Sequence, residues 1–420
     1  MEIPLLDTLR SVLQFRRFEL NATTRRLASA ANVADLRLLA KKRLPGGVFD
    51  YIDGAAEDEI TRDANNEAFR RTEFKPRILR DVSVLDTTTT ILGKPLPLPL
   101  ILAPTGFTRI ADPQGELAVA RAADRANIPY TLSTMSTRTI EEVRAVSNGR
   151  LWFQVYVWKD RAMVHDMVKR AKAANYEALM LTVDTAVLGR RERDVRRGFS
   201  LPPKIGLETV IDGIMHPSWT WQFARSEPIK FATIAGSTSA SDSGAVDGSS
   251  AVSLAEFTAK QFDQKLSWAD VDWFRSIWEG PIIIKGIQTV ADAQIAADIG
   301  MSCIALSNHG GRQLDTAPAI FDLIAPVADA LQDRVELICD GGIRRGSDIV
   351  KAVAAGAQAA MSGRAYLYGL GAAGERGVDH VITMLNNDVH RVMSLLGATN
   401  ISELNRDLLQ FAPAGYRTTH

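Results

Sequence analysis

The chain has 420 residues, of which 46% are hydrophobic, 23% charged and 7% aromatic; this is ordinary usage for a globular protein and excludes intrinsic disorder over most of its length. Its 49 basic and 49 acidic residues cancel, so no overall charge favours a nucleic-acid partner. The longest apolar run, 96–107, contains three prolines and falls far short of the roughly 20 residues that span a bilayer.

The N-terminal 30 residues carry both arginines and acidic residues, and they contain no apolar stretch followed by a cleavage site. We therefore expect no secretory signal, with a transit peptide as the alternative. The two cysteines, Cys303 and Cys339, lie in apolar runs typical of buried strands and are too few for a disulfide framework or a zinc site. They favour a reducing compartment, and we expect the protein in the cytoplasm.

The chain is expected to divide into three parts. Residues 1–95 are predicted to form a helical segment that packs on a barrel, 96–396 the barrel itself, and 397–420 a C-terminal tail. Within the barrel part, short β-rich runs bounded by turn residues predict eight strands. These runs cover residues 98–103, 129–133, 151–157, 178–183, 281–285, 303–306, 335–339 and 359–361.

Helical patterns separate most of these runs, and the clearest covers residues 161–174. Strands that alternate with helices indicate a parallel sheet, and eight such units predict a (β/α)8 TIM barrel. A doubly wound sheet is the alternative, but no glycine-rich fingerprint follows the first strand. A GxGxxG pattern at Gly369, Gly371 and Gly374 follows the start of a helix instead of a strand, so we do not interpret it as a dinucleotide site.

An insertion is predicted after the fourth strand, because roughly a hundred residues separate Asp184 from the fifth strand where a crossover needs far fewer. The insertion covers about 205–265. It holds Trp219, Trp221 and Phe223, followed by a small and polar run at 235–253 that is typical of flexible chain. Loops after barrel strands lie at the catalytic face, so we expect a lid or a docking surface.

The C-terminal ends of barrel strands face the active site. Every predicted strand carries polar residues or glycines there; a polar cap explains any one of them but not the whole set. In chain order they are Pro104, Thr105 and Gly106; Ser133; Gln154 and Tyr156; Thr182 and Asp184; Lys285; Ser307 and His309; Asp340 and Gly342; and Gly363 and Arg364.

The loops after the seventh and eighth strands predict a phosphate site. The segments 340–346 and 362–364 combine glycine amides with arginines, including Arg344 and Arg364. TIM barrels commonly bind phosphate between these two loops and a helix N-terminus. A phosphorylated cofactor or substrate is therefore expected.

His309 is the predicted base. It follows a buried strand, lies before a pair of glycines, and has Arg312 three residues on. An imidazole beside a guanidinium suits removal of a proton from a substrate whose carboxylate the arginine binds. Asp184 is expected to orient the ring. The other five histidines are interpreted as structural or surface residues, and their spacing predicts no metal site.

Lys285 ends an apolar strand, and the residues alone leave two roles open for it. Its amine suits a Schiff base, as in barrel aldolases. Its fixed charge equally suits stabilisation of electrons that enter a cofactor ring.

Eight motifs in this order resemble the FMN-dependent L-2-hydroxy-acid dehydrogenases and oxidases, and within them the bacterial quinone-linked L-lactate dehydrogenases. The resemblance runs from about residue 38 to 396. The motifs are FDYIDGAAEDE at 49–59, PTG at 104–106, FQVYV at 153–157, LTVDT at 181–185, IIIKGI at 282–287, SNHGGRQLD at 307–315, DGGIRRG at 340–346 and SGR at 362–364.

The resemblance implies a role for each matching residue. His309 is implied as the base and Asp184 as its partner, with Lys285 beside the flavin as a stabiliser of added electrons. Substrate-binding residues are implied to be Tyr51, Tyr156, Arg191, His309 and Arg312. FMN-binding residues are implied to be Pro104, Thr105, Gly106, Ser133, Gln154, Thr182, Lys285, Ser307, Asp340, Gly342, Arg344, Gly363 and Arg364.

The activity so implied is FMN-dependent oxidation of an L-2-hydroxy acid, with L-lactate to pyruvate expected and electrons passed to a quinone or another acceptor. Whether hydrogen leaves carbon as a hydride or as a proton stays open, and His309 is the base in both. Alternatives are mandelate or a longer hydroxy acid with oxygen as acceptor, a peptide-modifying FMN oxidase, and a flavin-binding protein without turnover.

Two departures from the family pattern bear on specificity. Met135 stands where glycolate oxidases carry an aromatic residue, which leaves the substrate size open, and Gly106 stands where several oxidases carry alanine. The resemblance further implies a homotetramer. The aromatic and basic residues of 207–231 suit peripheral contact with the inner face of the membrane, although a lid or a subunit contact explains them equally well.

Overall fold

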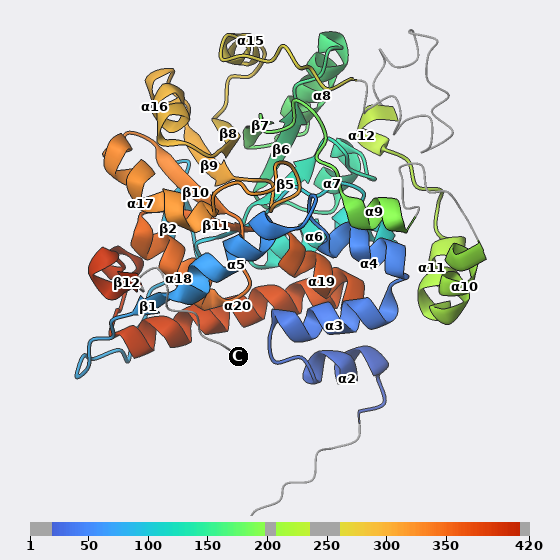
Figure 1. Ribbon diagram of the computed structural model, residues 1–420, viewed down its shortest axis with the longest axis horizontal. Coiled ribbons are helices and arrows are strands. Elements are labelled where there is room, and N and C mark those ends of the chain that lie inside the picture. Colours follow the sequence, from blue (N-terminus) through green and yellow to red (C-terminus); the bar gives the residue numbers. More distant parts are fainter. Residues whose placement is uncertain (1–18, 198–206, 236–260, 412–420) are drawn as a thin grey trace, which may run out of the picture.

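The computed structural model describes residues 19–197, 207–235 and 261–411. It opens with four helices, of which the first three lie at the lower right of Figure 1 and the fourth crosses the middle of the view. After them the chain becomes extended and forms three short strands before the barrel starts, so the segment predicted as helical over 1–95 is helical only as far as Arg71. These elements are α2 (Ala22–Ala28), α3 (Val33–Arg43), α4 (Gly46–Asp53), α5 (Ile60–Arg71), β1 (Thr72–Phe74), β2 (Thr89–Ile91) and β3 (Lys94–Leu96).

Eight parallel strands then close into a barrel, which confirms the predicted (β/α)8 TIM barrel. Each strand pairs with the next along the chain, and the last pairs with the first. The barrel strands are β4 (Leu100–Leu102), β5 (Tyr130–Ser133), β6 (Leu151–Tyr156), β7 (Ala178–Thr182), β8 (Ile282–Ile287), β9 (Cys303–Ser307), β10 (Glu336–Asp340) and β11 (Ala359–Ser362).

All eight predicted strands exist, with small errors in their bounds. The first begins at Leu100 instead of 98, and the fifth continues to Ile287 through an irregular register after Lys285. The strands are buried on both faces, one against the barrel interior and the other against the helices. This double burial explains why they read as continuous apolar runs without alternation.

Helices surround the barrel (Figure 1). The helix predicted at 161–174 is α8, which is capped by the Asp160 carboxylate accepting from the Met163 amide at 3.0 Å. The barrel helices are α6 (Gly115–Arg125), α7 (Ile140–Ala145), α8 (Arg161–Ala173), α15 (Asp270–Ile277), α16 (Val290–Asp298), α17 (Ile320–Leu331), α18 (Gly346–Ala355), α19 (Arg364–Ala373) and α20 (Glu375–Leu396). A short 3-10 turn, η1 (Thr108–Ile110), precedes α6.

The GxGxxG pattern serves helix packing. Gly369 and Gly371 lie inside α19, and Gly374 separates α19 from α20. A Cβ atom at Gly369 would lie 2.4 Å from the Gly377 carbonyl oxygen, and one at Gly371 would lie 2.8 Å from Leu44. Only glycine lets α19 approach α20 and α3 this closely.

The C-terminal residues return to the N-terminal part of the chain. After α20 the chain forms η2 (Ile401–Glu403), η3 (Arg406–Leu408) and β12 (Leu409–Phe411). Strand β12 pairs antiparallel with β1, so the part predicted as a tail is attached to the N-terminal part of the chain as far as residue 411.

The insertion after β7 contributes four described helices at one edge of the molecule (Figure 1). These are α9 (Glu192–Arg196), α10 (Leu207–Met215), α11 (Pro217–Arg225) and α12 (Ala232–Ala235). The run predicted as flexible at 235–253 falls almost wholly on residues outside the described part. Within the described ranges, no helix is long and apolar enough to cross a membrane.

Candidate active site

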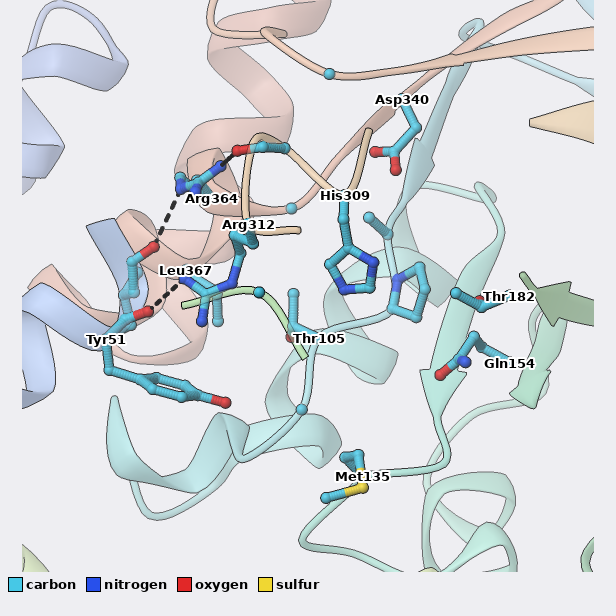
Figure 2. A pocket seen from close by; sticks show the side chains of 18 of the residues that line it. Tyr51, Thr105, Met135, Gln154, Thr182, His309, Arg312, Asp340, Arg364 and Leu367 are labelled. Carbon is cyan, nitrogen blue, oxygen red and sulfur yellow. Dashed lines mark hydrogen bonds between the residues drawn. The ribbon is translucent and has the colours of Figure 1, made fainter. Parts of the chain in front are cut away.

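A cavity of about 670 Å³ opens at the C-terminal ends of the barrel strands. All eight strands or the loops that follow them contribute to its lining, and α4 adds Tyr51 from outside the barrel. Figure 2 shows Tyr51 and Arg312 reaching in from one side and Gln154 and Thr182 from the other, with His309 between them. The convergence of polar strand ends expected from the sequence is therefore present.

The predicted site residues fall into two sets. Three of them lie one layer behind the cavity wall: Asp184 behind His309, Ser133 behind Gln154, and Ser307 between Lys285 and Asp340. The others line the cavity directly; they are Tyr51, Pro104, Thr105, Gly106, Gln154, Tyr156, Thr182, Arg191, Lys285, His309, Arg312, Asp340, Gly342, Arg344, Gly363 and Arg364.

His309 is held in an unusual backbone conformation. Its φ of 58° is left-handed, and Gly310 and Gly311 continue the left-handed turn with φ of 66° and 75°. Such a φ is uncommon for a residue with a side chain and clusters at functional sites. The turn is fixed from outside the barrel, because the Ala56 amide donates to the Gly311 carbonyl at 2.8 Å.

The His309 imidazole is paired with Asp184. Nδ1 lies 3.1 and 3.2 Å from the two carboxylate oxygens, which leaves Nε2 for the cavity. Burial lowers the pKa of His309 below its ordinary value of 6.5, although Asp184 acts in the opposite direction. Burial raises the pKa of Asp184, but His309 and Lys285 outweigh it, so this pKa lies below its ordinary value. At neutral pH the pair is a neutral imidazole held by a carboxylate, which is the state a base requires.

Two arginines line the cavity without acidic partners. Arg312 donates to the Tyr51 and Gly54 carbonyls at 2.7 and 2.9 Å and stacks on the Tyr51 ring. Burial and the neighbouring charge of Arg191 lower the pKa of Arg312 to about 9. Among the described residues, neither arginine has a carboxylate within 4 Å, and Nε of Arg191 has no hydrogen-bond partner. Their unused donors suit a carboxylate ligand.

Lys285 is fully enclosed. Its Nζ lies 2.8 Å from Asp340 and donates to Ser307 at 2.9 Å. Burial lowers the pKa of Lys285, but Asp340 and Asp184 outweigh it, so the pKa lies above its ordinary value. A Schiff base needs a neutral amine. Of the two roles that the sequence leaves open, this arrangement therefore favours the fixed positive charge.

The loops after β10 and β11 form a cradle rich in positive charge. Gly342 has a φ of 82°, and a Cβ atom there would lie 2.4 Å from the Asn65 carbonyl oxygen. Gly363 is the N-cap of α19, so free helix amides point to this end of the cavity. Arg364 donates to the Ile52, Gly54 and Gly310 carbonyls and to no other group in the described ranges, and burial together with Arg344 lowers the pKa of Arg364 to about 10.

Within the described chain, neither Arg344 nor Arg364 has an acidic partner within 4 Å. Two partly buried guanidiniums beside a helix N-terminus suit a dianion such as phosphate. The phosphate site expected from the sequence therefore has the required donors.

Residues 40–411 match the sequence model of the family described as FMN-dependent dehydrogenase. This chain belongs to that family. A Mycobacterium tuberculosis protein named "Putative L-lactate dehydrogenase" is 44% identical over 96% of this chain and 94% of its own length. Glycolate oxidase 1 of Zea mays is 40% identical over 90% of this chain and 95% of its own length.

The solved structures agree. The crystal structure of the monotopic membrane protein (S)-mandelate dehydrogenase superposes with a TM-score of 0.86 at 39% identity, covering 91% of this chain and all of that one. The relatives are FMN-dependent enzymes of 2-hydroxy acids, and this protein is accordingly an FMN-dependent 2-hydroxy-acid oxidoreductase. The resemblance stated from the sequence is confirmed.

The residues of this FMN-dependent dehydrogenase fit its cofactor. Three buried polar atoms that line the cavity have no hydrogen-bond partner among the described residues: Nε2 of Gln154, Oγ1 of Thr182 and Oγ of Ser362. A buried polar atom without a partner is costly, so these three call for a polar ligand. The edge of a flavin and its ribityl chain supplies such groups, while the arginine cradle matches its phosphate.

Sequence reasoning missed several lining residues. Ser362 was recognised only as part of a strand end. Phe231 and Phe262 come from the insertion, Leu188 from the loop after β7, and Asp194 from α9. None of these four lies at the end of a barrel strand, so the sequence carried no signal that they face the cavity.

Exchanging Thr182 for valine tests the cofactor site. Thr182→Val removes an unpartnered hydroxyl at constant shape, so it is expected to stabilise the apoprotein by about 1 kcal/mol while weakening FMN binding about tenfold. Thermal unfolding and quenching of FMN fluorescence measure the two effects.

Thr131→Val is the matched control, because the Thr131 hydroxyl is also buried and unpartnered but does not line the cavity. It is expected to stabilise the protein similarly and to leave FMN affinity unchanged. Equal FMN affinity in Thr182→Val and wild type would contradict this assignment.

Proposed function

We propose that this protein oxidises L-lactate to pyruvate and passes the electrons to a quinone. The observation that carries the proposal is the neutral His309 imidazole, oriented by Asp184, beside two arginines that lack acidic partners. The choice of lactate is supported by the similarity to the Mycobacterium tuberculosis protein named "Putative L-lactate dehydrogenase".

The chain's own residues divide the work of the reaction. Arg312 and Arg191 bind the substrate carboxylate and so orient the carbon that is oxidised. Nε2 of His309 accepts a proton from the substrate, and Asp184 stabilises the imidazolium that forms. FMN, when bound, would take up the two electrons together with the second hydrogen of the substrate, and the charge of Lys285 would stabilise the added electrons.

Two tyrosines complete the substrate site in this proposal. The ring of Tyr51 packs under Arg312 at 5.1 Å, and Tyr156 lies on β6 with its ring 5.3 Å from that of Phe262. Burial raises the pKa of Tyr156, so its hydroxyl stays protonated and acts as a hydrogen-bond donor to the substrate.

(S)-Mandelate is the second candidate substrate. An apolar wall of Met135, Leu188, Val195, Phe231 and Phe262 lines the cavity and suits a larger apolar side chain. Anaerobic reduction of the flavin by L-lactate, (S)-mandelate and glycolate, compared at equal concentration, ranks the candidates. Bleaching by none of them would instead favour a flavin-binding protein without turnover or a peptide-modifying oxidase.

His309→Gln is expected to slow anaerobic flavin reduction by about 10²- to 10⁴-fold, because the substrate proton then has no acceptor. Stopped-flow absorbance at saturating substrate measures the rate. His165→Gln, at an exposed histidine of α8, is the control and should retain the wild-type rate. A His309→Gln rate within tenfold of wild type would overturn the assignment of the base.

The reaction should depend on pH through His309. Only the neutral imidazole accepts a proton, and its pKa lies below 6.5, so flavin reduction is expected to be constant above about pH 7 and to fall as the pH drops through that pKa.

Asp184→Asn removes the charge that raises the His309 pKa and should move this fall to lower pH, besides lowering the plateau. A shift to higher pH would contradict the described role of Asp184. The rate constant for flavin reduction at limiting substrate, measured from pH 4.5 to 8.5, shows the direction of the shift.

The choice of quinone over oxygen rests on Gly106, because several oxidases of the family carry alanine at this position. A Cβ atom there would lie 2.8 Å from the Met135 Cβ, so the loop after β4 accommodates Met135 only because residue 106 is glycine. We expect reduced enzyme to be reoxidised faster by a soluble quinone than by air-saturated buffer in side-by-side stopped-flow runs. The opposite order would make the protein an oxidase that releases hydrogen peroxide.

Helices α10 and α11 are the proposed contact with the inner face of the membrane. They lie at one edge of the molecule (Figure 1) and expose several large apolar side chains. Trp219, expected on this surface, instead turns inward and donates to the Ile110 carbonyl at 2.7 Å. The exposed residues are Val210, Ile211, Ile214, Met215, Trp221 and Phe223. The cytoplasm stays the proposed compartment and the homotetramer stays a prediction.

Ile214→Glu tests the membrane contact. It is expected to lower co-sedimentation with anionic phospholipid vesicles about tenfold, because a carboxylate cannot enter the apolar interface. Leu395→Glu is matched in exposure, 70% against 69%, but lies at the far end of α20 and should bind as wild type does. Equal binding by all three proteins would contradict the proposal.

A further inference from the structure

The helix that carries Arg191 lacks the usual support of apolar packing. Arg191 is the N-cap of α9, and none of the five side chains of this helix is buried. Asp194 and Val195 face the cavity. Since burial of an apolar face supplies most of the stability of helices in proteins, α9 needs another anchor.

Repulsion between two arginines increases the need for an anchor on α9. Arg191 and Arg312 both line the cavity, and the charge of Arg191 contributes to the lowered pKa of Arg312. Like charges in a buried site repel each other. This repulsion tends to separate the two arginines, and the Asp194 carboxylate on α9 offsets only part of it.

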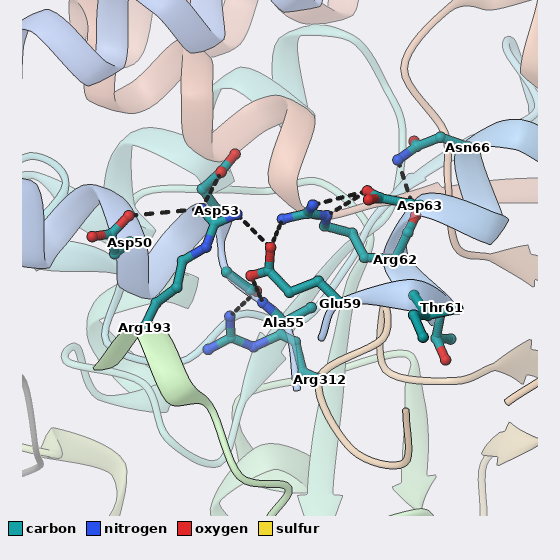
Figure 3. Close-up of polar contacts among 12 residues, drawn as sticks. Asp50, Asp53, Ala55, Glu59, Thr61, Arg62, Asp63, Asn66, Arg193 and Arg312 are labelled. Carbon is teal, nitrogen blue, oxygen red and sulfur yellow. Dashed lines mark hydrogen bonds and ion pairs between the residues drawn. The ribbon is translucent and has the colours of Figure 1, made fainter. Parts of the chain in front are cut away.

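Arg193 anchors α9 through ion pairs. Its guanidinium lies 2.9 Å from Asp53 and also pairs with Glu59 (Figure 3). The backbone adds one hydrogen bond, from the Glu57 amide to the Arg190 carbonyl at 2.9 Å. All three contacts join the loop that carries Arg191 to the end of α4 and the start of α5, and a fourth, the ion pair between Arg197 and Asp50 at 3.0 Å, joins the C-cap of α9 to α4.

The two carboxylates are set in place by other partners. Asp53 accepts from both Nε and Nη2 of Arg37 and from the Tyr368 hydroxyl, at 2.5 to 2.7 Å. Burial raises the pKa of Asp53, but these hydrogen bonds outweigh it and hold its pKa well below the ordinary value. Glu59 accepts from the Ala55 amide at 2.9 Å and from Arg62 at 2.5 Å. Both carboxylates thus keep partners when Arg193 is removed.

The same stretch of chain also anchors the other half of the site. Arg312 donates to the Tyr51 and Gly54 carbonyls, immediately beside Asp53. Arg193 and Arg312 are therefore fixed to one short segment, 51–59, and the distance between the two substrate arginines depends on it.

We propose that Arg193 is a positioning residue for substrate binding: its ion pairs with Asp53 and Glu59 hold α9 over the cavity and fix Arg191 against Arg312. The inference rests on the proposed function, in which these two arginines bind the substrate carboxylate. Arg193 itself does not line the cavity.

Arg193→Met tests the inference, with Arg196→Met as the matched control. Arg196 lies on the same helix, is more exposed, and pairs only with Glu192 one turn away. In Arg193→Met, the dissociation constants for the hydroxy acid and for oxalate, read from the flavin spectrum of the holoenzyme, are expected to rise about tenfold. The limiting rate of flavin reduction should stay within about threefold, because His309 and Asp184 are untouched.

Arg193→Lys should bind oxalate with intermediate affinity, because an ammonium reaches one carboxylate where the guanidinium fork reaches two. Hydrogen exchange of the backbone at 190–197 should accelerate in Arg193→Met but not in Arg196→Met, and exchange at 46–63 should be unchanged in both. Arg196→Met should bind both ligands within twofold of wild type.

Oxalate affinity in Arg193→Met within twofold of wild type would overturn the inference. So would faster exchange at 46–63 together with an equal fall in affinity and limiting rate, since that pattern belongs to general loosening. If the wild-type holoenzyme binds oxalate but no hydroxy acid reduces its flavin, the proposed function is refuted instead. The oxalate and exchange results would still decide whether Arg193 is a positioning residue.

Discussion

The site depends on buried positive charge that backbone carbonyls hold in place. Arg312 and Arg364 lie at the mouth of the barrel, and they donate to the carbonyl oxygens of residues 51, 52, 54 and 310. Carbonyl dipoles orient a guanidinium without neutralising it. An enclosed charge without a counter-ion costs stability in the free protein, and that cost is recovered when an anion binds. The same feature therefore explains a carboxylate site and a phosphate site in one cavity.

Lys285 and His309 are each paired with a carboxylate, and the pairing separates two kinds of chemistry. Lys285 lies against Asp340 and stays charged, whereas His309 lies against Asp184 and stays neutral. The difference follows from the side chains: an ammonium has an ordinary pKa far above neutrality, so a carboxylate easily keeps it protonated, while burial is enough to deprotonate an imidazole. One permanent charge and one base can thus share a cavity.

Residues outside the barrel assemble these parts. The segment 51–63 bonds to the loop after β7 through Glu57 and Asp53, to the turn after His309 through Ala56, and to the N-terminus of α19 through Gly54. Asp315 adds a further contact to this segment, because its carboxylate accepts from the Thr61 amide at 2.8 Å. Loops on a barrel are individually free to move. Because the segment 51–63 contacts three of them, it fixes the geometry of the site.

The sequence by itself determined the barrel, the order of its strands and most of the polar strand ends that meet at its mouth. These features follow from local signals, because apolar runs, helical periodicity and strand ends can each be recognised from residues close together in the sequence. A closed parallel barrel then brings all the C-terminal strand ends to one rim. The tertiary structure alone decided which of those residues face the cavity. Ser133 and Ser307 stand behind the wall, Trp219 turns inward, and Phe231 and Phe262 arrive from an insertion. It also decided the charge state of Lys285 and the role of Arg193, because both depend on carboxylates that are distant in sequence and become neighbours only through packing.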